Sequence, residues 1–160
     1  MKASGTQAVL SSATWKKVLM IPGSSGGTVY WRVVGSGTTV KSGVRLFGVE
    51  AADAVGNPEI SPTNKSSLPT LSWENNCGVK FKAWFGSDSS FTKKASYAFS
   101  VKNPNDNGGL FSKGLTSGQW KAIRKLVNDT AGSMIYWYVE SWDGLNRKSE
   151  TEPMNFTLTD

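Results

Sequence analysis

The side chains that could do chemistry in this 160-residue chain are twelve carboxylates and one thiol, because the sequence contains no histidine. The chain therefore lacks the commonest general base and the commonest imidazole metal ligand, and a serine–histidine pair is impossible. No two carboxylates form a recognisable acid–base motif. Cys77 lies in a turn-like stretch and has no second cysteine with which to form a disulfide. The sequence predicts a protein that is not an enzyme and that needs no cofactor.

Two short stretches have oxygen ligands that calcium could use. One begins at Asp53 and the other at Asp143, and each reaches a glycine and an asparagine within four residues. Asp and Asn also stabilise such turns by hydrogen bonding to their own backbone. Neither stretch has the ligand density of a calcium loop. The turn interpretation is favoured, and no metal site is predicted.

Lys and Arg outnumber Asp and Glu by 18 to 12, which gives a net charge of +6. A basic balance can indicate a nucleic-acid partner or an anionic surface. Here the basic residues are spread along the chain and no recognition helix is evident, so nucleic acid is not a predicted partner. No apolar stretch is long enough for membrane insertion. The first residues lack the apolar centre of a signal peptide, so the signal of an exported protein is expected upstream of this sequence.

Alternating apolar and polar residues predict β-strands through most of the chain. The clearest are residues 79–85, 97–101 and 134–142, and residues 28–34 are a shorter likeness of the last. A loop is predicted at residues 103–109. The best helical signal is residues 116–127, which have a Thr or Ser cap and one apolar face. This short helix is predicted to cross between two sheets.

Three stretches of the chain recur in the same order at offsets of 105, 106 and 109 residues. They pair residues 12–17 with 117–122, 28–33 with 134–139, and 44–49 with 153–158. This period is the size of one sandwich domain. The repeat predicts that residues 1–58 are the C-terminal half of one repeat plus a linker, and that residues 59–160 are a complete domain. The linker is placed at residues 51–65, and the first strand of the complete domain near residues 68–73.

At these residues the chain resembles bacterial fibronectin type III-like domains. The motifs are an opening strand at residues 68–73, a strand end at 85–91, a Leu-Thr-x-x-x-Trp turn at 115–120, a Tyr-Trp-x-Val strand at 136–139 and a Phe-bearing strand at 155–158. The resemblance covers most of residues 66–160 and, in half measure, residues 12–50. It implies an all-β sandwich of the fibronectin type III or immunoglobulin-like class, with one complete copy preceded by the C-terminal half of another.

The phase of the strands divides the large aromatic residues into two sets. The expected core anchors are Trp31, Trp73, Trp120, Trp137 and Phe156. The outward or strand-end set is Trp84, Tyr136, Tyr138 and Trp142. Exposed aromatic rings can form a protein contact or stack on sugars. Packing against other elements of the fold is the favoured interpretation of the second set, and a partner surface is the alternative.

The resemblance implies a non-catalytic structural or interaction module of a larger secreted or cell-surface bacterial protein, acting as a spacer or as an adhesion or assembly domain. The alternatives are a carbohydrate-binding module of a polysaccharide-active protein and a filament subunit assembled by strand exchange. A half sandwich cannot close its own core and leaves edge strands unpaired. The expected partners are therefore neighbouring repeats or other copies of the chain, by strand pairing, with polysaccharide as a further candidate.

Overall fold

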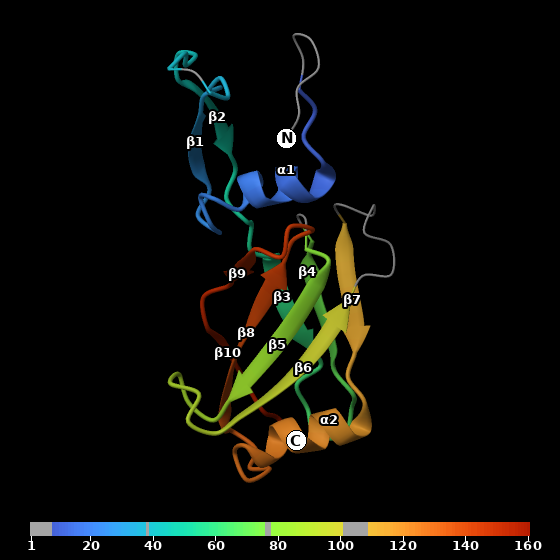
Figure 1. The fold of residues 1–160 in the computed structure, drawn as a ribbon. Coiled ribbons are helices and arrows are strands. Elements are labelled where there is room, and N and C mark those ends of the chain that lie inside the picture. Colours follow the sequence, from blue (N-terminus) through green and yellow to red (C-terminus); the bar gives the residue numbers. More distant parts are fainter. Residues whose placement is uncertain (1–7, 38, 76–77, 101–108) are drawn as a thin grey trace. The chain divides into compact units, whose positions relative to one another are not determined.

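The computed structural model describes residues 8–37, 39–75, 78–100 and 109–160 (Figure 1). Cys77 and most of the loop predicted at residues 103–109 lie outside the described residues. Internal contacts divide the chain into two compact parts, residues 1–52 and 53–160. We refer to them as unit 1 and unit 2 and describe each by itself.

Unit 2 is a sandwich of two antiparallel sheets (Figure 1). One sheet has the strand order β3-β4-β7, and the other has the order β10-β8-β5-β6, in which the short β9 shares one edge of β8 with β10. This fold is an all-β sandwich of the fibronectin type III or immunoglobulin-like class, as predicted. The elements are β3 (Gly56–Ser61), β4 (Thr70–Glu74), β5 (Lys80–Gly86), β6 (Lys94–Ser100), β7 (Leu110–Gly114), α2 (Ser117–Lys125), β8 (Met134–Trp142), β9 (Lys148–Glu150) and β10 (Met154–Thr157).

The core of unit 2 is built on aromatic rings held between the two sheets. Trp73, Trp120 and Trp137 are all buried, with at most 2 % of the side chain exposed. Phe156 is half-buried and packs against this core. Full burial of a side chain of this size stabilises a fold by roughly 2–3 kcal/mol. These residues of β4, α2 and β8 therefore contribute strongly to holding the two sheets together.

The helix α2 begins where the sequence places a cap. The Thr116 hydroxyl accepts a hydrogen bond from the Gln119 N–H at 3.3 Å, and the Gln119 side chain accepts one from the Thr116 N–H at 2.8 Å. This capping box satisfies N–H groups that have no partner within the helix. The helix follows β7 of one sheet and precedes β8 of the other, so it crosses between the sheets as predicted.

The expected linker at residues 51–65 contains the first strand of unit 2, so that prediction was wrong. Strand β3 pairs with β4, and the register shifts between Gly56 and Glu59. The turn-forming residues that suggested a linker, including Asn57 at a positive φ of 43°, form this irregularity. Residues 68–73 accordingly hold the second strand of the sandwich.

After β3 the chain crosses to the opposite sheet and meets the last residues of the protein. The Lys65 N–H donates to the Thr159 carbonyl at 3.0 Å, and the Thr159 N–H donates to the Thr63 carbonyl at 3.1 Å. Asn64 and Thr159 form a parallel bridge, and Lys65 forms an ion pair with Asp160 at 2.7 Å. A strand that changes sheets in this way closes the corner of a sandwich.

Unit 1 consists of one helix and one antiparallel hairpin. They are α1 (Ser12–Leu19), β1 (Gly27–Trp31) and β2 (Arg45–Val49). Among its described hydrophobic residues only Val29 is buried. Trp31 is 48 % exposed, so its assignment as a core anchor was wrong within this chain. The sequence pattern assigns Trp31 to one face of its strand, but the described residues of unit 1 contain no second sheet to cover that face.

The internal geometry of unit 1 corresponds to that of α2, β8 and β10 in unit 2, without the short β9. The caps Ser11 and Thr116 stand 105 residues apart, at the offset of the sequence repeat. In register, β1 pairs with β2 as β8 pairs with β10. The corresponding pairs are Thr28–Gly48 and Met134–Thr157, Val29–Phe47 and Ile135–Phe156, Tyr30–Leu46 and Tyr136–Asn155, and Trp31–Arg45 and Trp137–Met154.

Candidate functional site

The outer face of the larger sheet of unit 2 gathers the outward aromatic residues named from the sequence. Along β8 the buried residues alternate with half-buried ones, so that one series faces the core and the other faces outward. The outward series is Tyr136, Tyr138, Glu140 and Trp142, and Trp84 lies on the same face because β5 pairs it with Tyr138. All four aromatic residues are half-buried.

Trp84 is enclosed by its neighbours on this face. Its ring stacks with that of Tyr138 at 6.2 Å between centroids and 10° between planes. The Lys82 ammonium lies 3.9 Å from the centroid of the Trp84 ring, and that of Lys94 lies at 5.2 Å. The indole N–H donates to Glu140 Oε2 at 2.8 Å. Both the π-face and the polar edge of this tryptophan are thus already used within the domain.

A lysine bridge lies beside this group, at the start of β9. Glu140 and Glu150 are directly opposite in the β8–β9 pair, an arrangement of like charges that is unfavourable alone. Lys148 Nζ lies 3.1 Å from Glu140 Oε1 and 2.9 Å from Glu150 Oε2, so it forms an ion pair with both carboxylates and offsets their repulsion. The hydrogen bonds to Glu150 and then to Glu140 raise the pKa of the Lys148 ammonium above its usual 10.5.

The turn between β5 and β6 extends the same cluster. Phe91 lies edge-on against Tyr138 at 4.9 Å and 89°, and the Phe91 backbone has a positive φ of 54°. Asp88 holds this turn by accepting hydrogen bonds from the backbone N–H groups of Ser90 and Thr92. Burial, followed by the negative charge of Glu140, raises the pKa of the Tyr138 hydroxyl above its usual 10.0. We name Lys82, Trp84, Phe91, Lys94, Tyr138 and Glu140 the Trp84 cluster.

Two shallow hollows flank the Trp84 cluster. One has a volume of about 420 Å³ and is lined by residues that include Lys80, Lys82, Phe99 and Trp142. The other has a volume of about 220 Å³ and is lined by Phe91, Tyr138 and the strand-edge residues 150–153, with Ser89. Both are partly open to solvent, unlike the enclosed pockets that bury most of a small ligand.

In the two stretches considered for calcium, different oxygen atoms of the aspartate accept the hydrogen bonds: the side-chain carboxylate of Asp143 and the backbone carbonyl of Asp53. The Asp143 carboxylate accepts from the N–H groups of Leu145 and Arg147 and from the Arg147 guanidinium at 2.8 Å, so it caps its own turn. The Asp53 carbonyl accepts from the hydroxyls of Ser141 and Ser149 at 3.3 and 2.6 Å. No group of three or more His, Cys, Asp or Glu residues suited to a metal occurs within the part of the chain that the structure describes.

The sequence identified Trp84 and Tyr138 as outward aromatics but missed the charged residues around them. Lys82 stands two residues before Trp84 and Glu140 two residues after Tyr138, so period-two alternation places both on the same face. That signal was available. The approach of Lys94 and Phe91 depends on the β5–β6 pairing, which local spacing does not specify. Tyr136 and Trp142 lie on the same face at the two ends of β8.

Comparisons with known proteins give a fold likeness and no family. No family model matches the chain, and no curated protein matches it. One solved structure that resembles it is the crystal structure of selenomethionine-substituted chicken interferon gamma receptor alpha chain. The match has a TM-score of 0.39 and 10 % sequence identity, and it covers 85 % of this chain and 68 % of the receptor chain. The assignment of the fold rests on the strand order of unit 2.

Among the described residues, no helix is long and apolar enough to cross a membrane.

Proposed function

We propose that this chain is part of an array of sandwich domains in a larger secreted or cell-surface protein, bacterial by its sequence resemblance. In this role it is a non-catalytic structural and interaction module that acts as a spacer between the sites of adhesion or assembly. The observation that carries the proposal is the path of the chain through unit 2, which enters at one end of the sandwich and leaves at the other.

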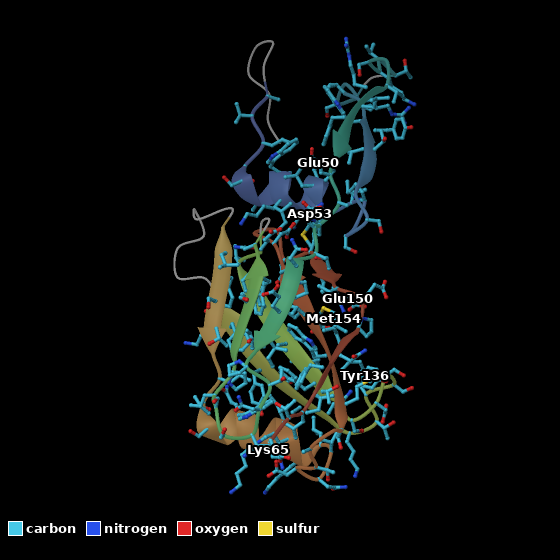
Figure 2. The ribbon with its side chains drawn as sticks, turned by 180° about the vertical axis from the view of Figure 1, so that it is seen from behind. Glu50, Asp53, Lys65, Tyr136, Glu150 and Met154 are labelled. Atoms are coloured by element: carbon cyan, nitrogen blue, oxygen red, sulfur yellow. The ribbon has the colours of Figure 1, made fainter. Side chains whose placement is uncertain are left out.

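The two ends of unit 2 are fixed by contacts with opposite ends of β8. The Asp53 carbonyl bonds to Ser141, near the end of that strand. Thr159 follows β10, whose Thr157 pairs with Met134 at the start of β8. Seven residues of strand between Met134 and Ser141 span roughly 23 Å. Figure 2 labels Asp53 and Lys65 at opposite ends of the sandwich, and Lys65 bonds to the last residues of the chain.

This path has a mechanical consequence. Tension between residues 53 and 160 pulls the first segment and the last segment in opposite directions along their length. The parallel bridge between residues 63–65 and Thr159 then resists by shear, with its two backbone hydrogen bonds loaded together. Such an arrangement suits a module that keeps its length under tension, and forced unfolding is governed by the unfolding rate that this bridge limits.

The test is the unfolding force of the full chain pulled from residue 52 and from the C-terminus. The only cysteine is replaced by Cys77→Ser, so that thiols introduced at the two pulling points are the sole attachment sites. Thr159→Pro removes the N–H that donates to Thr63 and is expected to lower the unfolding force of unit 2. Asp160→Ala, which removes only an exposed ion pair, is the matched control and is expected to change little. Equal forces for the wild type and Thr159→Pro, with the same thermal stability, would contradict the spacer role.

A carbohydrate-binding module is the second candidate, and the open hollow beside Trp142 is the observation that favours it. Against it, the Trp84 ring is stacked and its N–H is bonded within the domain, which leaves it little capacity to stack on a sugar. Tryptophan fluorescence titrated with soluble polysaccharides decides between the two. A saturable shift that Trp142→Ala abolishes and Trp15→Ala preserves supports carbohydrate binding, and the absence of any shift supports the structural module.

A further inference from the structure

The edge of β1 in unit 1 lacks the neighbour that the corresponding edge of β8 has in unit 2. Strand β8 is paired on one edge with β10 and on the other with β5. Strand β1 corresponds to β8 and pairs with β2 as β8 pairs with β10. Within the described residues, no named strand pairs with the other edge of β1. An unpaired edge of this kind is a template for a further strand.

The exposure of the side chains follows the same difference. Trp137 is 2 % exposed because it lies between the sheets, where its ring stacks on Phe85 of β5 at 6.0 Å and 8°. Its counterpart Trp31 is 48 % exposed. Val139 is fully buried, whereas its counterpart Val33 is 59 % exposed. The uncovered residues of unit 1 are thus the ones that β5 and the smaller sheet cover in unit 2.

We propose that β1 is completed by an antiparallel strand carrying an aromatic residue opposite Trp31, supplied by a front-half sandwich segment that precedes α1 in the same polypeptide. The proposal rests on the array of sandwich domains proposed above. The order of the segments follows unit 2, where β3 to β7 precede α2 along the chain. The ring opposite Trp31 takes the place that Phe85 has opposite Trp137.

Charge defines the occupant further. In residues 1–52 Lys and Arg outnumber Asp and Glu six to one, whereas in residues 53–160 they are nearly balanced. Arg32 is the counterpart of Tyr138, which lies on the outer face of its sheet. Arg32 is therefore expected on the outer face of the completed sheet, beside the missing strand. Tyr138 pairs with Trp84, so a lysine at the diagonal position of Lys82 would oppose this charge. The completing strand therefore carries an acidic or neutral residue at this position, unlike β5.

The same reasoning argues against a second copy of this chain that would pair its own β5 with β1. That strand is already paired on both edges, with β6 and with β8. It also carries Lys82, whose charge is unfavourable beside Arg32. Strand exchange between two copies is kept as an outcome that overturns the proposal.

The first test measures hydrogen exchange by NMR on the 160-residue chain, together with sedimentation equilibrium. An open edge predicts a monomer in which backbone amides of residues 28–31 that do not bond to β2 exchange at least about a hundredfold faster than their counterparts in β8. Protection of these amides equal to that of β8, in a monomer or in a dimer, would overturn the proposal. This result does not depend on the force measurement on unit 2, so the two proposals can fail separately.

The second test supplies a surrogate for the missing segment. Residues 53–115, carrying Lys82→Glu, are joined ahead of Ser11 in the full chain, in the order that unit 2 has. The added strand is expected to slow exchange of the β1 edge amides by at least about tenfold and to shift the indole N–H signal of Trp31. The matched control carries Phe85→Ala in the added segment and is expected to lose much of this protection. An added segment that protects its own amides but leaves β1 unchanged contradicts the proposal, and if it does not fold, the exchange measurement on the 160-residue chain decides alone.

Discussion

The ring of Trp120 in α2 lies 6.1 Å from the ring of Phe156 in β10, with 33° between their planes. The same contact occurs in unit 1, where Trp15 of α1 lies 5.4 Å from Phe47 of β2 at 35°. Each tryptophan stands four residues after its helix cap, Ser11 or Thr116. The same helix-to-strand ring contact therefore occurs twice: in unit 2, which is a complete sandwich, and in unit 1, which is not.

The two tryptophans are expected to differ in their contribution to stability. Trp120 is 1 % exposed and Trp15 is 42 % exposed. Trp120→Ala is expected to lower the free energy of unfolding of unit 2 by about 3–5 kcal/mol, because it leaves a cavity in the core. Trp15→Ala is expected to destabilise unit 1 by about 1 kcal/mol. Urea unfolding followed by NMR signals of each unit measures both, and equal losses would contradict the burial that separates them.

The capping box of α2 gives a second prediction. Thr116→Ala removes the side-chain acceptor of the Gln119 N–H and is expected to lower the stability of unit 2 by about 1 kcal/mol. Thr116→Ser keeps the acceptor and is the matched control. Urea-denaturation midpoints of the two variants provide the comparison. A loss in the serine variant as large as that in the alanine variant would show that the hydroxyl acceptor is not the source of the effect.

Lys148 gives a prediction on the strand edge. Lys148→Ala leaves Glu140 and Glu150 opposite one another without a bridging cation and is expected to destabilise unit 2 by about 0.5–1 kcal/mol. The raised pKa of Lys148 means that its stabilising effect is complete below pH 10.5 and is lost as the pH rises through the folded-state pKa. Thermal unfolding of wild type and Lys148→Ala should therefore converge at high pH. A difference that persists unchanged in strong base would refute the bridge.

Asp88 gives the complementary prediction at acid pH. The backbone N–H of Thr92 is the main cause that lowers the pKa of this carboxyl below 3.8. A lowered pKa contributes stability that is present above the unfolded value and is lost as the pH falls through the folded value. The thermal midpoint of the wild type is expected to fall more steeply than that of Asp88→Asn between about pH 5 and pH 2. Parallel curves for the two proteins would speak against this role.

Most of the sandwich could be read from local pattern, and the parts that could not depend on distant partners. Strands β5 and β8 alternate cleanly, and α2 has a cap and an apolar face, so each was expected where it occurs. Strand β3 was missed because its turn-forming residues form an irregularity within the strand.

The exposure of Trp31 and the presence of Lys94 and Phe91 in the Trp84 cluster could not be read from spacing alone. Alternation assigns Trp31 to a face but does not say whether a second sheet covers that face. Lys94 reaches Trp84 only because β6 pairs with β5, and Phe91 reaches Tyr138 across a turn. The sequence could place the aromatic residues and Lys82 on this face, but not Lys94, the second cation near the Trp84 ring.

The most direct test of the shared arrangement is a set of cross-strand NMR contacts in the isotopically labelled 160-residue chain. We expect contacts between Val29 and Phe47 that match those between Ile135 and Phe156, together with a contact from the Trp15 ring to Phe47. A hairpin in unit 1 with a different register, or a Trp15 ring without contact to Phe47, would contradict the claim that unit 1 repeats the closing half of unit 2.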